Sequence, residues 1–292
     1  MTIAIVPPLL TGPGVHSARL GRVLTRRPQL PATARISLVA ALALATSGLA
    51  LGAAQAATAI ALVDGTKLVT FDTETRAVSA TVDVTGADGL AGIDQRPADK
   101  LLYGVTLAGE VVTIDPATGA ATAKSTLSEK LPSYEGAIVD FNPMADRLRL
   151  MGTDGTNHRV NVDDGAVTVD GSLAFEEGDM HAGETPAIVA AAYTNSFGKP
   201  EATAMYDIDA TIVALIQQTK PNDGTLAAIG KLGVDGGSSY AFDIHATEDL
   251  TNTAYLVIGS TLYTVDLETG AATEQGAIEG VDGTISDIAV WN

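Results

Sequence analysis

The chain has 292 residues, with 17 basic and 35 acidic side chains, a formal charge of -18 and no cysteine. Five arginines and no acid fall in the first 56 residues, so residues 57–292 hold 12 basic against 35 acidic side chains, a formal charge of -23. Nucleic acid and anionic membranes are bound through basic side chains, so neither is expected as a partner. The lack of cysteine excludes disulfides, thiolate metal sites and cysteine nucleophiles.

An uncharged segment, residues 36–56, follows the arginines and ends in Ala-Gln-Ala at 54–56. A basic segment, an apolar segment and an Ala-x-Ala site in this order are typical of a secretory signal peptide. We therefore expect residues 1–56 to be a signal peptide, cleaved before Ala57, and the mature protein to be periplasmic or extracellular. An uncleaved membrane anchor is the alternative, because 21 uncharged residues are long enough to span a bilayer. The high alanine and glycine content of the segment favours cleavage.

From Ala57 onward, short β segments alternate with turns rich in Asp, Gly, Pro and Thr. Residues 90–127 contain four such segments, and the same pattern returns in 137–173, 187–233 and 239–278. A four-stranded unit of roughly 45 residues is the size of a β-propeller blade. Glycines that end turns between these segments are expected to supply the positive φ of hairpin turns; they are Gly119, Gly165, Gly224 and Gly270.

The two ends of the predicted domain are incomplete in complementary ways. Residues 284–292 provide one strand, and residues 58–85 provide three. We predict an all-β fold, a β-propeller of five four-stranded blades, in which one C-terminal strand joins three N-terminal strands and closes the ring. This arrangement gives one domain over residues 57–292 and leaves no open sheet edge at the seam. A six-bladed ring and an irregular β-sandwich are the alternatives.

An aspartate recurs at the same position of four predicted inner strands, as Asp94, Asp140, Asp243 and Asp287. A residue that every blade repeats is best explained by a need that every blade shares. We therefore favour a structural role, in which each carboxylate accepts hydrogen bonds from the backbone N–H groups of the turn that follows its strand. The alternative is acid–base chemistry in the channel, since paired carboxylates carry out glycoside hydrolysis.

The predicted second blade concentrates basic side chains. Arg147 and Arg149 alternate with leucines on one strand, and Arg159 lies on the next. A buried polar face must find partners or line a pocket, so we favour an ion-pair network, with Asp140, Asn142 and Asp146 as the nearest acceptors. If the face binds a ligand instead, the candidate residues are Asp140, Asn142, Asp146, Arg147, Arg149, Asn157, Arg159, Tyr193 and Asn195.

Metal binding has little support in the sequence. His158, His181 and His245 lack the i,i+4 or His-x-His spacing of a zinc site. The acidic stretch 176–179 offers oxygen ligands but belongs to no complete calcium loop, so a solvated loop is the favoured interpretation. We expect no cofactor, with calcium as the one ion left open. Nucleophile elbows, phosphate-binding loops and dinucleotide fingerprints are absent from residues 57–292.

Six segments resemble, in order, the exported bacterial family DUF4394, a domain of unknown function. They are GIDQRPADKLLYG (92–104), DFNPMADRLRL (140–150), TNHRVNVDDG (156–165), AAAYTNS (190–196), MYDID (205–209) and QTKPNDGTL (218–226). The resemblance covers essentially the whole of residues 57–292. It implies an exported, β-propeller-like domain, and it brings no established activity, substrate or catalytic residue.

These observations favour an exported, non-catalytic binding or scaffolding module. We expect a monomer that binds a small molecule, a glycan or a protein, with no membrane span after signal cleavage. The alternative function is a propeller hydrolase that cleaves a glycan or a lactone through channel-facing carboxylates. A structural component of the cell exterior is a third interpretation. Carboxylates that converge at one end of the channel would favour the hydrolase.

Overall fold

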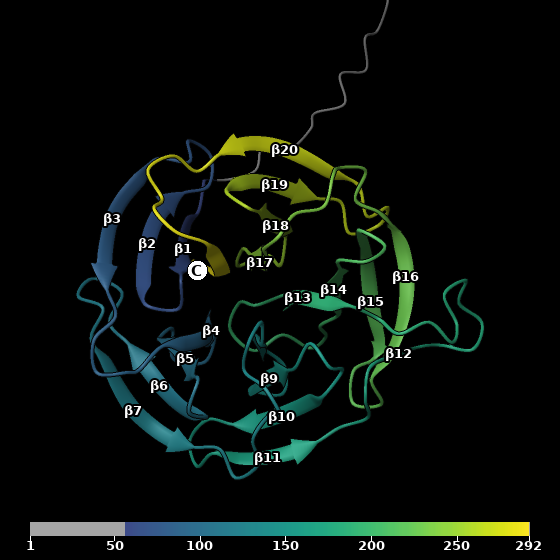
Figure 1. Ribbon diagram of the computed structural model, residues 1–292, viewed down its shortest axis with the longest axis horizontal. Coiled ribbons are helices and arrows are strands. Elements are labelled where there is room, and N and C mark those ends of the chain that lie inside the picture. Colours follow the sequence, from purple (N-terminus) through teal and green to yellow (C-terminus); the bar gives the residue numbers. More distant parts are fainter. Residues whose placement is uncertain (1–55, 292) are drawn as a thin grey trace, which may run out of the picture. The chain divides into compact units, whose positions relative to one another are not determined.

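The computed structural model describes residues 56–291, and the regular elements of this range are all strands. Five sheets surround a central axis and form a five-bladed β-propeller, which confirms the predicted fold (Figure 1). Within the described range, no helix has the length and apolar character needed to cross a bilayer. The predicted signal peptide lies outside the described residues, apart from its last position, Ala56.

We number the blades I to V in chain order. Blade I contains β1 (Thr58–Val63), β2 (Lys67–Asp72), β3 (Val78–Asp83) and the last strand, β21 (Ile285–Trp291). Blade II contains β4 (Leu90–Gln95), β5 (Leu102–Thr106), β6 (Glu110–Ile114) and β7 (Ala121–Thr126). Blade III contains β8 (Ile138–Asn142), β9 (Arg147–Met151), β10 (Asn157–Asn161) and β11 (Ala166–Val169).

Blade IV has five strands rather than the predicted four. They are β12 (Ala174–Phe175), β13 (Ile188–Tyr193), β14 (Met205–Asp209), β15 (Ala214–Lys220) and β16 (Thr225–Lys231). The additional strand, β12, pairs parallel to the outer strand β16 and buries Phe175. Blade V contains β17 (Tyr240–Ala246), β18 (Asn252–Ile258), β19 (Thr261–Val265) and β20 (Ala272–Ala277).

The ring closes through blade I, as predicted. β21 runs antiparallel to β1, from the pair Thr58↔Trp291 to the pair Val63↔Ile285. Figure 1 shows β21 on the inner side of β1, next to the inner strand β17 of blade V. The two ends of the domain are thereby held in one sheet, and neither leaves an unpaired inner strand at the seam.

Apolar residues of the inner strands form the core between neighbouring blades. Every residue of β4 and β5 is buried, whereas β3 and β7 have no buried residue. The sequences agree with this difference, because inner segments such as LAGID are apolar apart from their aspartate, and outer segments such as ATAKST are polar and small. The polar side chains found on buried inner strands therefore need specific partners.

The four predicted turn glycines have positive φ, between 69° and 81°. Gly165, for example, has a φ of 75°, which is unfavourable for a residue with a Cβ. A Cβ on Gly165 would also lie 2.0 Å from the carbonyl oxygen of Thr126 in blade II. Glycine at this turn therefore serves both the hairpin and the close approach of the neighbouring blade.

Candidate functional site

The four repeated aspartates join neighbouring blades. Asp94, for example, accepts the backbone N–H of the following residue, Gln95, and that of Phe141 in blade III, at 2.6 and 2.7 Å. The other interblade bonds run from Ile93 N–H to Asp287, from Tyr193 N–H to Asp140 and from Val290 N–H to Asp243. A structural role for these carboxylates is confirmed, but the predicted partner, the turn after the strand, is wrong.

The junction between blades IV and V differs from the other four. The inner strand of blade IV carries alanines at 190–192 and no aspartate. The loop after this strand is tied to blade V instead, because Asn195 N–H donates to the Asn252 side chain at 2.7 Å and the Asn252 amide donates to Asn195 at 2.8 Å. Asn195, a candidate ligand-binding residue, thus contributes to an interblade contact.

Three of the four repeated aspartates, called the channel carboxylates below, converge. Oxygens of Asp94, Asp140 and Asp243 lie within 4.8 Å of one another, and they form the one group among the described residues with the spacing of a metal site. Burial raises the pKa of all three, to about 6 for Asp243, and the charge of a neighbouring carboxylate raises those of Asp94 and Asp140 further. Such a group can share protons or bind a cation.

In the acidic loop 176–179, the Asp179 carboxylate accepts backbone N–H groups of His181 and Ala228.

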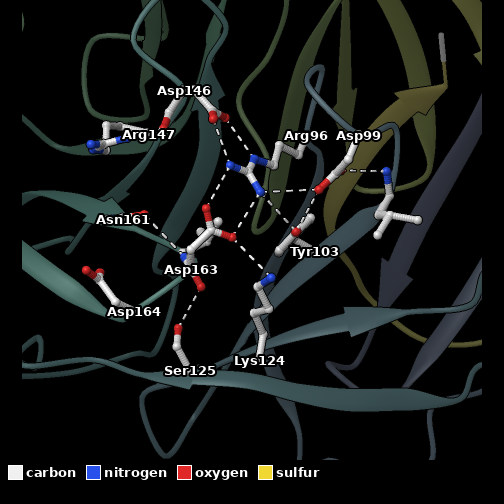
Figure 2. A network of polar contacts seen from close by, with 12 residues as sticks. Arg96, Asp99, Tyr103, Lys124, Ser125, Asp146, Arg147, Asn161, Asp163 and Asp164 are labelled. Atoms are coloured by element: carbon white, nitrogen blue, oxygen red, sulfur yellow. Dashed lines mark hydrogen bonds and ion pairs between the residues drawn. The ribbon is translucent and has the colours of Figure 1, made fainter.

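An arginine that the sequence analysis did not select joins blades II and III. Arg96, directly after β4, donates two hydrogen bonds of 2.7 Å to Asp146, and its guanidinium also contacts Asp163 at 3.3 Å and Asp99 at 3.2 Å (Figure 2). Hydrogen bonds from Arg96 hold the pKa of Asp146 below its usual value. Asp146, a candidate partner of the blade III arginines, is therefore bound to Arg96 at the junction of blades II and III. Arg147 donates to the backbone oxygen of Asp146 and takes no part in the buried network described next.

Arg149 is the centre of a buried polar network at the junction of blades III and IV. Its side chain is 1% exposed, and its Nη1 donates to Asp170 at 2.7 Å and to Asn157 at 2.8 Å. Arg159 donates to both oxygens of the same carboxylate, through Nε at 2.6 Å and through Nη2 at 2.9 Å. The Asn157 amide in turn donates to the backbone oxygen of Pro221 in blade IV at 2.8 Å. The predicted ion-pair network exists, but its acceptor is Asp170 rather than the acids nearest in sequence.

A hollow of about 390 Å³ opens beside this network. The turn between β8 and β9, the loop between β13 and β14 and the hairpin between β15 and β16 surround it. It is lined by Asn142, Met144, Tyr193, Thr203, Lys220, Pro221, Asn222 and Asp223. Arg149 donates to two of these residues, Tyr193 and Asn222, each at 3.2 Å. The volume of the hollow falls in the range of about 300–1,000 Å³ that is usual for small-molecule sites.

Next to the network, a buried acid faces an amide. Oδ2 of Asp207 accepts the Gln218 amide N–H at 2.9 Å, while Asp207 Oδ1 and Gln218 Oε1 are buried without a hydrogen-bond partner. Burial raises the pKa of Asp207 to about 7. A proton on the carboxyl group supplies the donor that both oxygens lack, so the neutral acid suits this position.

These buried acids predict a melting temperature that falls as the pH rises from about 5 to about 8. Burial raises the pKa of Asp207 to about 7 and that of Asp243 to about 6, whereas an unfolded aspartate titrates near ~3.9. Between these values each of the two acids is protonated in the folded protein and ionised in the unfolded chain, so its contribution to the free energy of unfolding decreases as the pH rises. Between pH 5 and pH 8, Asp207 alone accounts for roughly 2.5 kcal/mol of this decrease. Thermal unfolding followed by circular dichroism over this pH range tests it.

The substitution Asp207→Asn separates the contribution of this acid. The amide is neutral at every pH and still pairs with Gln218, so the variant should melt higher than the wild type at about pH 8 and show a flatter profile. Asp88→Asn, at an exposed position, is the matched control and should keep the wild-type slope. A wild-type melting temperature that stays constant or rises with pH would contradict the prediction.

Comparison with known proteins identifies the family. The family model described as "Domain of unknown function (DUF4394)" matches residues 67–289. The chain belongs to the DUF4394 family. None of the curated proteins matches the chain of this DUF4394 protein.

Three solved structures that match the chain do so at low sequence identity. A protein of unknown function from Bacteroides thetaiotaomicron is 17% identical, with a TM-score of 0.45 over 82% of this chain and 66% of that one. An auxiliary nutrient binding protein of the same organism is 12% identical, with a TM-score of 0.42 over 74% and 57% of the two chains. A luciferin-regenerating enzyme is 10% identical, with a TM-score of 0.44 over 76% and 72%. The DUF4394 chain thus spans about two thirds or less of the first two proteins.

The nine candidate residues of the DUF4394 domain separate into distinct places. Asn142 and Tyr193 line the hollow, and Arg149, Asn157 and Arg159 form the network behind it. The remaining four lie elsewhere: Asp140 among the channel carboxylates, Asp146 and Arg147 at the junction of blades II and III, and Asn195 at the contact with blade V.

Several residues of the site were missed in the sequence. Asn222 lies in the segment Pro-Asn-Asp-Gly, whose composition indicates a turn and nothing more, and its partner Arg149 is 73 positions away. Asp170 lies in the connection after blade III, and a single acid in such a connection gives no indication of its partner. Of these residues, only Lys220 could have been selected from the sequence, because it is one of just 12 basic residues in 57–292 and directly precedes that turn.

Proposed function

We propose that this DUF4394 protein is an exported, non-catalytic binding module whose ligand occupies the hollow between blades III and IV. The observation that carries the proposal is the contact of Arg149 with two residues of the hollow wall, Tyr193 and Asn222. A buried network holds these walls in place before any ligand arrives. A pre-formed wall lowers the entropic cost of binding. Export to the periplasm or the cell exterior rests on the signal-peptide pattern of residues 1–56.

The dimensions of the hollow suit a small molecule or the end of a glycan chain. Its wall combines amide, hydroxyl and charged groups with the apolar surfaces of Met144 and Pro221. Binding sites for small polar ligands share this combination, in which apolar contact gives affinity and a few polar groups give orientation.

A hydrolase that uses the channel carboxylates is the second candidate, and the convergence of Asp94, Asp140 and Asp243 favours it. Acid–base hydrolysis needs one protonated and one ionised carboxyl group, a difference that unlike surroundings normally provide. The channel acids instead share one kind of surrounding, since each accepts a backbone N–H from the next blade. Turnover of a chromogenic glycoside or lactone, with or without calcium, that is lost in a folded Asp140→Asn variant would establish the hydrolase and overturn the binding module.

Filling the hollow tests the proposal. Met144 is 44% exposed and lines the hollow, so Met144→Trp should obstruct it without disturbing the core. We expect compounds that bind the wild-type protein, found by ligand-observed NMR with a set of monosaccharides, amino acids and small carboxylates, to lose binding to this variant.

Met180→Trp is the matched control. Met180 is 85% exposed and does not line the hollow, so this variant should bind like the wild type. Equal binding to Met144→Trp and to the wild type would place the ligand elsewhere and refute the proposed site.

A further inference from the structure

The network behind the hollow contains more positive than negative charge. Arg149 and Arg159 share a single carboxylate, that of Asp170, whose side chain is 4% exposed. Asp207 also lies near Arg149, and burial raises the pKa of this group to about 7, so it offers little compensation at or below neutral pH. Asp140 stands opposite Arg149 in the strand pairing, and burial raises its pKa well above the usual value too. A guanidinium that is buried in this way favours an anion placed beside it.

Tyr193 directs a hydrogen-bond donor into the hollow. Its side chain is 1% exposed, and its hydroxyl oxygen accepts the Arg149 Nε–H at 3.2 Å. Because the oxygen accepts this bond, its own hydrogen points elsewhere, and none of the hydrogen bonds of the described residues is donated by this hydroxyl. The hydroxyl of Tyr193 can therefore donate its hydrogen to a ligand in the hollow.

Two more donors lie on the same wall. Asn222 uses its carbonyl oxygen for Arg149, which leaves its amide N–H groups for a ligand. Lys220 is exposed and forms no ion pair within the described part of the chain. Asp223 is the one acid of the lining, and it is exposed. It can therefore accept a hydrogen bond from a hydroxyl group of a ligand that the donors on the wall bind.

We propose that the ligand of the hollow is a small hydroxycarboxylate, whose carboxylate is bound by the Tyr193 hydroxyl, the Asn222 amide and the Lys220 ammonium. The inference rests on the proposed function, because it assigns a chemical class to the same site. Hydrogen bonds from charged or polarised donors to a carboxylate are stronger than those to a neutral oxygen, so the carboxylate sets the affinity.

Matched pairs of charged and neutral compounds test the class. Lactate is compared with lactamide, and D-glucuronate with D-glucose, by calorimetric or NMR titration of the full chain at about pH 6. We expect at least one carboxylate to bind roughly tenfold or more tightly than its neutral counterpart, with an affinity that falls as salt is added. Lys220→Gln should weaken this carboxylate by roughly tenfold and leave its neutral counterpart unaffected, since it removes the charge alone.

Two control variants and a second site variant complete the experiment. Lys130→Gln removes an exposed positive charge away from the hollow, and Tyr263→Phe removes a hydroxyl in blade V, so both should bind as the wild type does. Tyr193→Phe should weaken carboxylate binding, and its melting curve establishes that it remains folded. Equal affinity for both members of each pair, or no binding of either carboxylate, overturns the hydroxycarboxylate. The hollow itself is judged separately, because Met144→Trp abolishes binding of any occupant, charged or neutral.

Discussion

Deletion of residues 283–292 is expected to abolish cooperative unfolding of the domain. These residues contain β21, which supplies three large buried side chains, Ile285, Ile288 and Val290, to the core between blades I and V. Burial of each contributes roughly 1.5–3 kcal/mol, and together they approach the whole stability of a typical domain, about 5–15 kcal/mol. The loss of Asp287 also removes the hydrogen bond to Ile93 of blade II. Circular dichroism and thermal unfolding of the truncated chain test this.

Addition of a synthetic peptide with the sequence of residues 283–292 should restore part of the transition. The peptide can pair with the edge of β1 that the deletion exposes, as an added strand does in other sheet complexes. A peptide of the same composition in scrambled order is the control. A truncated chain that melts like the full-length protein would show that the ring does not depend on closure by the last strand.

The architecture of the domain was predictable because it rests on local, repeated signals. Short β segments separated by turns, with glycines in these turns, mark the strands of the blades, and the count of strands at the two ends requires closure between them. The additional strand β12 escaped prediction because two residues, Ala174 and Phe175, carry no periodicity. It pairs through its neighbour β16 rather than through a pattern of its own.

The candidate site was predictable only in part, because its contacts join segments that are far apart in the sequence. Alternation along β9 placed Arg149 on a polar face, and the expectation of a partner followed from the cost of burying a guanidinium. The identity of the partner depends on how blades III and IV meet, which no local pattern encodes. Of the two acids chosen by proximity, Asp146 is bound to Arg96 and Asp140 accepts the backbone N–H of Tyr193. The hollow itself is formed by three connections whose sequences indicate only turns and loops.

Arg149→Ala is expected to lower the free energy of unfolding by about 3–5 kcal/mol, the usual effect of removing one partner of a buried ion pair. The substitution leaves Asp170 with Arg159 alone and leaves the oxygens of Asn157 and Asn222 without their donor. Urea denaturation measures the effect.

Arg147→Ala is the matched control for this change. Arg147 lies two positions earlier on the same strand and bonds only the backbone oxygen of Asp146, so its removal should cost less than about 1 kcal/mol. Arg149→Lys should fall between the two, because an ammonium group retains the charge but cannot reach four acceptors in the plane of a guanidinium. Equal stability of Arg149→Ala and Arg147→Ala would contradict the network as a source of stability. The walls of the hollow would then have to be held by the backbone of blade IV rather than by Arg149.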